Sequence, residues 1–206
     1  GSVGTLNLGA GNYVTCLAAS GSILYAGGRF KSLGGVSRQN LAAIDTSSGM
    51  ALSWNPGTNN VVNALKVSGS TVYIGGSFTS AGGQTRNGIA AIDASTGLAT
   101  AWNPNANGLI QAIAVTGSAI YAGGLFTNIG GENRFFLAAL DPGTGNATSW
   151  NPAPNNQVQA IEVSGSNVYV GGLFTQIGLT PRIALASVDS GTGLAADWAP
   201  QMNQAV

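Results

Sequence analysis

The chain contains no histidine and a single cysteine, Cys16. Without histidine it lacks the side chain that most often serves as a general base and as a metal ligand near neutral pH. One cysteine allows neither an internal disulfide nor a cysteine cluster that would hold zinc or an iron–sulfur centre. A Ser–His–Asp triad is therefore excluded, and we expect no metal site, no cofactor and no enzymatic activity.

Charged residues are also scarce, because seven Lys and Arg are balanced by seven Asp and Glu among 206 residues. A chain of zero net charge has no long-range field that would attract a nucleic-acid backbone or an anionic lipid surface. Glycine and small polar residues interrupt every apolar stretch well before the length of about 18 residues that a membrane helix needs. We therefore expect no nucleic-acid partner and no membrane span.

What the sequence does contain is internal repetition. Its four tryptophans follow one another at intervals of 48 residues, and an arginine and an aspartate recur at the same interval. These three columns are Trp54, Trp102, Trp150 and Trp198; Arg38, Arg86, Arg134 and Arg182; and Asp45, Asp93, Asp141 and Asp189. A fixed repeat of this length is typical of propellers and solenoids.

Each repeat has room for four strands and no stretch that favours a helix. In the second repeat the strand candidates are residues 61–69, 70–80, 87–95 and 98–104. The turns between them are expected at Ser68-Gly69, Gly82-Gly83 and Thr96-Gly97. This spacing predicts an all-β fold, a β-propeller of four-stranded antiparallel blades. A β-solenoid is the second choice, since its rungs are usually shorter and rarely need four distinct strand patterns.

The repeat interval also predicts the organisation of the chain as one propeller domain. Its expected parts are 1–11 as the terminal strand of a preceding blade, 12–59, 60–107, 108–155 and 156–203 as four repeats, and 204–206 as the start of a further repeat. Leu6 aligns with Trp54, so a simple four-bladed ring would have one outer strand too many. Uncovered blade faces would expose several hundred Å² of apolar surface, on the order of the largest patches that monomers tolerate. We therefore expect a fragment of a larger propeller or a homo-oligomer, preferably a dimer that completes an eight-bladed ring.

Two sequence patterns resemble known propeller families. The stretch AAIDASTGLATAW, residues 90–102, resembles the tryptophan-docking motif of quinoprotein-type eight-bladed propellers, although it has one additional residue before the tryptophan. The longer stretch IGGSFTSAGGQTRNGIAAIDASTGLATAWNP, residues 74–104, is more similar to the delta-sixty type (quinoprotein/WD-like) repeats of bacterial secreted and surface proteins, and the pattern recurs across 12–203. This resemblance implies a propeller fold and an extracellular or cell-surface bacterial location. It brings no catalytic residue.

The repeated residues have structural explanations. An aspartate such as Asp93 precedes a turn in which a carboxylate accepts backbone N–H groups, and Gly97 supplies the positive φ that the turn needs. An ion pair between Arg86 and Asp93, repeated in every blade, would account for most of the charge in the chain. Tryptophan is expected to wedge between neighbouring blades. Cys16 replaces an alanine of the other repeats and is expected to be a small buried hydrophobe.

Binding residues are expected where the repeats differ around these fixed positions. The candidates for contact with a partner are Gln39, Asn87, Phe135, Phe136 and Ile183. Adjacent aromatic residues on a strand point to opposite faces, so one of Phe135 and Phe136 is expected to be exposed, with packing between blades as the alternative.

Three functions are open at this point. The first is a non-catalytic extracellular scaffold or adhesion module that binds a protein through its variable loops. The second is a lectin-like protein with one shallow saccharide site per blade, built from the repeated Asn, Thr and Trp residues. The third, a fragment of a quinoprotein-type enzyme, is disfavoured because a cysteine pair and a carboxylate cluster are missing.

Overall fold

The computed structural model describes residues 9, 11–198 and 200, and all regular secondary structure within them is β-strand. The strands form four sets, one in each expected repeat. The first set is β1 (Tyr13–Ser20), β2 (Ile23–Arg29), β3 (Ser32–Leu33), β4 (Val36–Ser37) and β5 (Leu41–Asp45). The second is β6 (Val62–Ser68), β7 (Thr71–Gly76), β8 (Ser80–Ala81), β9 (Gln84–Thr85) and β10 (Ile89–Asp93). The third is β11 (Leu109–Val115), β12 (Ile120–Leu125), β13 (Asn128–Ile129), β14 (Glu132–Asn133) and β15 (Leu137–Leu140). The fourth is β16 (Val158–Ser164), β17 (Asn167–Gly172), β18 (Gln176–Ile177), β19 (Thr180–Pro181) and β20 (Leu185–Asp189).

Each set contains a three-stranded antiparallel sheet and a separate two-stranded hairpin. The sheets run β1-β2-β5, β6-β7-β10, β11-β12-β15 and β16-β17-β20, and the hairpins are β3-β4, β8-β9, β13-β14 and β18-β19. The turns expected in the second repeat are confirmed, because Gly69, Gly82, Gly83 and Gly97 all have positive φ. The expected all-β fold is likewise confirmed.

The expected fourth strand of each blade is wrong as a regular strand. In the second repeat, segment 98–104 makes only an isolated bridge between Ala99 and Ile92. It leaves the sheet after the Thr100 amide has bonded to the carbonyl of Ala91. Two features of the segment explain this: Trp102 reaches over to the next repeat, and Pro104 has no N–H to donate to a ladder.

A β-bulge lies at the same place in the first strand of every sheet. In β6 the register shifts between Val62 and Ala64. The backbone of this strand then runs so close to β7 that a Cβ added to Gly76 would overlap the carbonyl oxygen of Val61. Gly28, Gly124 and Gly172 meet the same obstacle in the other repeats. Glycine is required at this position because two backbones approach each other there.

The apolar core lies between successive sets of strands. Each of three large clusters combines residues of two neighbouring repeats. The cluster between the first two repeats takes Tyr25, Leu41, Ala43 and Trp54 from one, and Val62, Leu65, Val72, Ile74, Phe78, Ala81, Ala90 and Ile92 from the other. The fourth, smaller cluster belongs to the first repeat alone: Ala26, Phe30, Leu33, Ala42 and Ile44. Neighbouring repeats therefore hold one another together, as in other repeat proteins.

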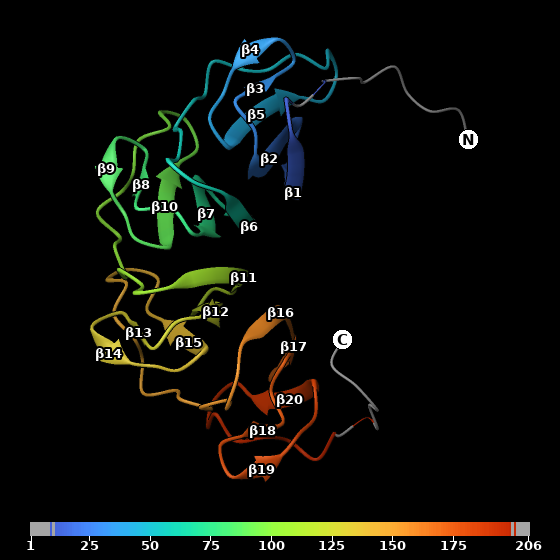
Figure 1. Ribbon diagram of the computed structural model, residues 1–206, viewed down its shortest axis with the longest axis vertical. Coiled ribbons are helices and arrows are strands. Elements are labelled where there is room, and N and C mark those ends of the chain that lie inside the picture. Colours follow the sequence, from blue (N-terminus) through green and yellow to red (C-terminus); the bar gives the residue numbers. More distant parts are fainter. Residues whose placement is uncertain (1–8, 10, 199, 201–206) are drawn as a thin grey trace.

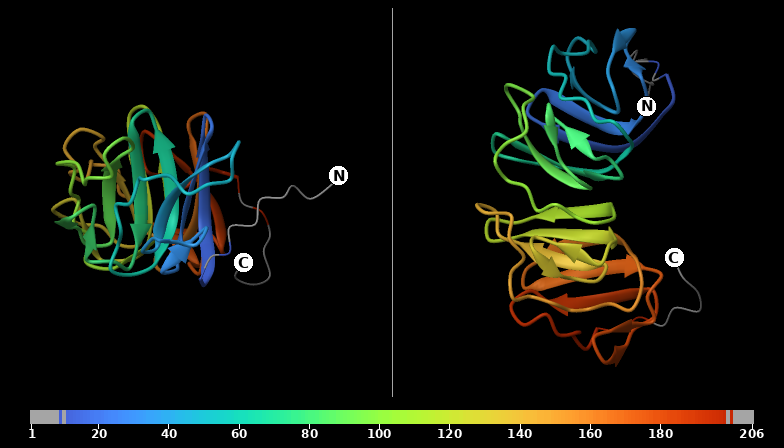
Figure 2. Two further views of the ribbon diagram at one scale, coloured as in Figure 1. Left: turned by 90° about the horizontal axis from the view of Figure 1, so that it is seen from above. Right: turned by 60° about the vertical axis from the view of Figure 1, so that its left-hand side comes forward.

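Figure 1 shows the four sheets in sequence order along a C-shaped arc, and Figure 2 shows the same arc from two other directions. The first strands β1, β6, β11 and β16 lie on the inner side and contact one another in that order. The hairpins lie on the outer side (Figure 1). The first and fourth sets form the two ends of the arc. The expected extra strand at 1–11, including Leu6, and the expected start of a further repeat at 204–206 fall wholly or almost wholly outside the described residues.

Candidate functional site

The aspartate column caps a turn, as expected from the sequence. Oδ1 of Asp93 accepts hydrogen bonds from the amides of Ser95 (3.0 Å) and Thr96 (2.7 Å) and from both hydroxyls (2.6 and 2.9 Å). These donors lower the pKa of Asp93 to about 2, with the Ser95 hydroxyl as the largest contribution. The Ser47 hydroxyl and the Ser48 donors likewise lower the pKa of Asp45 to about 2. The four carboxylates are thus structural groups that stabilise turns.

A pH dependence of stability follows from these depressed pKa values. A carboxyl group whose pKa is lower in the folded state than in the unfolded state stabilises the fold above the unfolded pKa, near 4, and loses that contribution as the pH falls through the folded pKa. We therefore expect the melting temperature to fall between about pH 4 and pH 2, and to fall less in Asp93→Asn. Thermal melts from pH 2 to 7 measure this. A wild type and an Asp93→Asn variant with the same acid profile would contradict it.

The expected ion pair between the arginine and aspartate columns is wrong. Nη2 of Arg86 donates to the carbonyl of Thr100 (2.6 Å), and Nη1 donates to the carbonyl of Thr85 (2.7 Å). Arg134 and Arg182 make the equivalent bonds, and Arg38 does so to Leu52 and Ser37. The arginine thus ties each hairpin to the segment that leads to the tryptophan. The aspartate is already surrounded by turn donors, and backbone carbonyls accept from Nη1 and Nη2 of the guanidinium instead, while its buried Nε has no partner within the described residues.

The tryptophan column joins successive repeats. Nε1 of Trp54 donates to the carbonyl of Asp93 (3.0 Å), Trp102 to Asp141 (2.9 Å) and Trp150 to Asp189 (2.9 Å). Each indole also makes an edge contact with a tyrosine of its own repeat, such as Tyr73 with Trp102 at 5.3 Å between ring centroids. The expected wedge between blades is confirmed for these three residues. They are buried, so the saccharide hypothesis loses them as stacking surfaces.

Cys16 is half-buried on β1, where its sulfur approaches the carbonyl of Val62 in the next repeat (3.7 Å). Burial raises the pKa of the thiol to about 11. The expectation of an inert hydrophobic cysteine agrees with this environment, because the reactive thiolate is almost absent at neutral pH.

We expect a thiol reagent at pH 8 to modify Cys16 at least about a hundredfold more slowly in the folded protein than in urea, since the unfolded thiol has a pKa near 8.5. Absorbance measurements with a chromogenic disulfide provide both rates. Similar rates in the two states would show that the thiol is not protected.

The variable positions lie on and beside the outer hairpins. Their large apolar side chains are exposed: Phe135 is 46% exposed, Ile183 is 50% exposed, and Leu179 at the turn of the fourth hairpin is 95% exposed. Gln39 is exposed as well, and Asn87 is half-buried. Structure and sequence therefore agree that this side of the molecule offers the most varied chemistry.

Phe135 and Phe136 differ in exposure, as predicted, although for another reason. They follow β14 in a turn and are not part of a strand, and Phe136 adopts a positive φ of 63°. This conformation turns Phe136 toward the cluster shared by the third and fourth repeats. Phe135 remains exposed, and its ring centroid lies 6.4 Å from that of Phe136. Asn40, Gly88 and Ala184 occupy the equivalent position with positive φ, so the turn fixes this orientation in every repeat.

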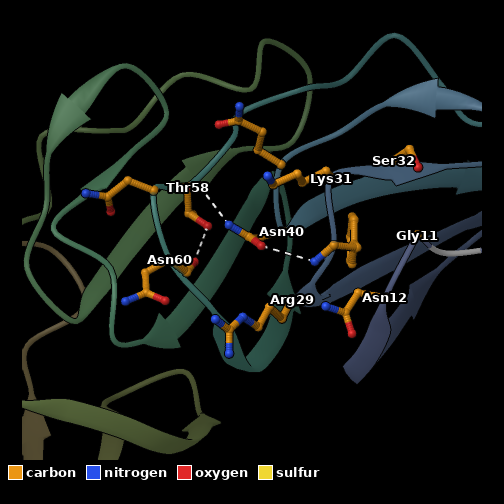
Figure 3. Close-up of a pocket in the computed structure, with 11 residues that line it drawn as sticks. Gly11, Asn12, Arg29, Lys31, Ser32, Asn40, Thr58 and Asn60 are labelled. Atoms are coloured by element: carbon orange, nitrogen blue, oxygen red, sulfur yellow. Dashed lines mark hydrogen bonds between the residues drawn. The ribbon is translucent and has the colours of Figure 1, made fainter.

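A cavity of about 580 Å³ lies between the first two repeats. Figure 3 shows its lining, which includes Arg29, Lys31, Asn40, Thr58 and Asn60. Gln39, one of the predicted binding residues, also lines it. A second cavity of about 380 Å³ occupies the equivalent place between the second and third repeats, and Asn87 lines it. The structure thus places two predicted residues in related cavities.

Most side-chain amides in the larger cavity already make hydrogen bonds within the protein. Asn40 accepts from the amide of Phe30 (3.2 Å) and donates to the carbonyl of Thr58 (2.8 Å). Asn59 accepts from two backbone amides of the second repeat. Arg29 and Lys31 are different, because within the described residues neither side chain has a hydrogen bond or an acidic partner, and the single ion pair there joins Lys66 to Glu162.

Sequence reasoning missed these two cations because it followed the repeated columns. A signal was present, since Arg29 and Lys31 stand where the second repeat has Ser77 and Thr79. Among the described residues, no group of three or more His, Cys, Asp and Glu is arranged to hold a metal ion. The same part of the chain includes no helix that is long and apolar enough to cross a membrane.

Comparisons with known proteins support a propeller fold. A family model described as a domain of unknown function (DUF5122) beta-propeller matches residues 71–94. No curated protein matches the sequence. The short family match supports a β-propeller repeat family in general.

Solved structures with a similar fold share little sequence. The computationally designed Ika4 protein has a TM-score of 0.58 and 18% identity, with 89% of this chain and 94% of that chain covered. The computationally designed Ika8 protein has a TM-score of 0.61 and 18% identity, with coverage of 91% and 49%. A chain of the mitotic checkpoint complex has a TM-score of 0.61 and 13% identity, with coverage of 94% and 53%. This chain spans about half the length of the latter two, and the likeness concerns the fold alone.

Proposed function

We propose that the chain is a non-catalytic scaffold that binds a protein partner through the variable loops of a β-propeller. The observation that carries the proposal is the exposure of Phe135, Leu179 and Ile183 on and beside the outer hairpins that the arginine column anchors. Exposed aromatic and aliphatic side chains on a rigid support are typical binding anchors. The propeller fold suits such a role. Similarity to delta-sixty type repeats supports an extracellular or cell-surface bacterial setting.

The test is a binding screen of purified extracellular proteins by surface plasmon resonance, with the double variant Phe135→Ser and Ile183→Ser as the comparison. Both side chains are about half exposed, so the variant is expected to keep its melting temperature. We expect a partner that binds the wild type to bind this variant at least about tenfold more weakly. Equal binding by the two proteins would remove these loops from the proposal.

A second candidate function is the binding of an acidic saccharide in the cavity of the first two repeats. Its free groups are mainly donors, because the side chains of Arg29, Lys31 and Gln39 have no partner within the described residues while the asparagines are engaged. Such a set favours a ligand rich in carboxylate or sulfate oxygens. The second cavity has Ser77 and Thr79 at the positions of the two cations. The residues of the two cavities therefore do not favour one equivalent site in every blade.

The second cavity provides the residues for a matched variant that tests this candidate function. Arg29→Ser with Lys31→Thr gives the first cavity the residues of the second. We expect titration calorimetry with a sulfated and a neutral oligosaccharide to detect only the sulfated one, and the double variant to lose that binding. Lys66→Gln, which removes a cation that does not line the cavity, is the control. Binding that Lys66→Gln reduces equally, or none at millimolar ligand, would exclude this function.

A further inference from the structure

We propose that two copies of this chain close an eight-bladed ring, in which the fourth repeat of each copy docks on the first repeat of the other. The two ends of the arc would meet in this ring, whatever the outer loops bind. At each end, residues that pack on the next repeat in the interior have different surroundings.

The fourth repeat ends the arc with the half of a core that every other repeat buries against its successor. In the first repeat this half consists of Tyr25, Leu41, Ala43 and Trp54. The equivalent residues are Tyr169, Leu185, Ser187 and Trp198. Trp198 keeps its edge contact with Tyr169 at 5.3 Å, yet it is 47% exposed, whereas Trp54, Trp102 and Trp150 are 5–6% exposed.

The first repeat ends the arc with the complementary half. Its small cluster, led by Phe30 and Ile44, matches the second repeat's share of the core between the first two repeats. Val14 and Leu17 also belong to this half by their position in the repeat, and Leu17 is 57% exposed. Their equivalents Val62 and Leu65 are buried. The two ends are therefore the two halves of one repeat-to-repeat core, and their apolar surface favours association.

Within the described residues, the indole at the end of the arc also lacks the hydrogen bond that the other three indoles make. Each interior tryptophan donates to a carbonyl 39 residues further along, in the next repeat. Within the described residues Nε1 of Trp198 has no acceptor. When the repeat order is continued into a second copy, the corresponding acceptor is the carbonyl of Asp45 in that copy. Buried indole N–H groups usually find a partner.

We call the contact between the fourth repeat of one copy and the first repeat of the other the seam. One glycine in the second strand of each sheet also has different surroundings in the interior and at this seam. A Cβ added to Gly27, Gly75 or Gly123 would lie 2.5–2.8 Å from a β-branched side chain of the next repeat. At Gly171 the nearest atom would be the Cβ of Ala160 in its own repeat, at an ordinary 3.7 Å. A single copy therefore has room for a side chain at Gly171. A docked second copy would remove that room, since its Val14 takes the place that Val62, Ile110 and Val158 have in the interior.

Charge on the inner strands favours the same closure. Lys66 and Glu162 lie two repeats apart and approach to 4.0 Å. In a ring of two copies, Glu162 of one copy also lies two repeats from Lys66 of the other. Lysine and glutamate would thus alternate around the ring, so closure brings opposite charges together. Both groups are well exposed, so the gain from each pair is small and mainly selects the arrangement.

One polar feature of the seam is already satisfied. Ser187 donates to Asn167 at 3.1 Å, at positions where the first repeat has Ala43 and Ile23. A hydrogen-bonded pair costs little to bury because neither group loses its partner. The open side of the arc in Figure 1 lies between the two complementary ends. Since propellers typically have four to eight blades, two copies are the largest number that closes a usual ring.

The experiment is light scattering on a sizing column with the wild-type chain and three variants. We expect a wild-type mass near twice 20.5 kDa. Gly171→Val, which fits a single copy, is expected to weaken association about tenfold per seam, and about a hundredfold in a ring with two identical seams. Trp198→Ala is expected to weaken it similarly. Gly117→Ala, where an added Cβ meets nothing within 4 Å, is the control.

Circular dichroism of each variant separates a weakened seam from a misfolded chain. A second readout is tryptophan fluorescence. Dilution below the dissociation constant should shift the wild-type emission to longer wavelength, because Trp198 becomes exposed to solvent when the copies separate. A wild-type monomer at 100 μM, a mass of three or more copies, or a dimer that folded Gly171→Val and Trp198→Ala leave intact would each overturn the two-copy ring.

Discussion

Replacement of Gly76 by alanine is expected to lower the free energy of unfolding by about 3 kcal/mol or more, placing it among the most destabilising single substitutions in the chain. The bulge in β6 brings the carbonyl of Val61 against Gly76, and a Cβ at that position would overlap the oxygen. No side-chain rotation relieves this clash, because the backbone alone fixes the position of a Cβ and the atom it meets is a backbone oxygen. Either the bulge must straighten, which breaks the register of β6 with β7, or the strands must separate.

Urea unfolding followed by circular dichroism measures the effect. Gly117→Ala is the matched control, since Gly117 has open space around it and no positive φ. It should change the stability by no more than about 0.5 kcal/mol. An equal effect of the two substitutions would mean that β6 and β7 do not approach as closely as described.

Replacement of Trp102 by alanine is expected to cost about 4 kcal/mol. The indole is buried between the second and third repeats, makes an edge contact with Tyr73, and bonds to the carbonyl of Asp141. Its removal leaves a cavity at the middle of the chain and takes one of two donors from the carbonyl of Asp141, which keeps only the amide of Gly145. Because repeats are coupled through such interfaces, we also expect a single unfolding transition to become two.

The two-transition behaviour distinguishes this substitution from a general loss of stability. Leu98→Ala changes a residue of the same segment that is 61% exposed, so it should keep one transition at nearly the wild-type urea concentration. Fluorescence of the remaining tryptophans and circular dichroism should disagree in Trp102→Ala and coincide in the control. Coincident curves in both variants would show that the repeats unfold as one unit without this indole.

The sequence predicted much of the local structure because its repetition supplied four readings of each pattern. Asp93 before a turn and Gly97 within it have few local solutions, so the capped turn was predictable from a short segment. Trp102 was expected at a junction between repeats because a large aromatic residue in every repeat needs a shared core. These predictions depend on neighbours in the chain or on the period itself.

Other features depended on contacts that no short segment contains. The arginine column was expected to pair with aspartate because both recur, yet Arg86 donates to the carbonyl of Thr100, 14 residues further along in the segment that leads to the tryptophan. The fourth strand was expected from alternation, yet Trp102 draws its segment toward the next repeat. The cavity lined by Arg29 and Lys31 was missed because its walls come from segments that are far apart in the sequence and its cations occur only once.

By itself, then, the sequence determined the all-β class, the 48-residue period, the capped turns and the lack of histidine chemistry. Those properties follow from residue types and their spacing. Only the tertiary structure decided which carbonyl each arginine and tryptophan binds, which glycines touch another backbone, and which apolar side chains at the ends of the arc are exposed. The physical reason is that packing between repeats is set by distances across the chain, and identical patterns meet different surroundings in the interior and at the ends.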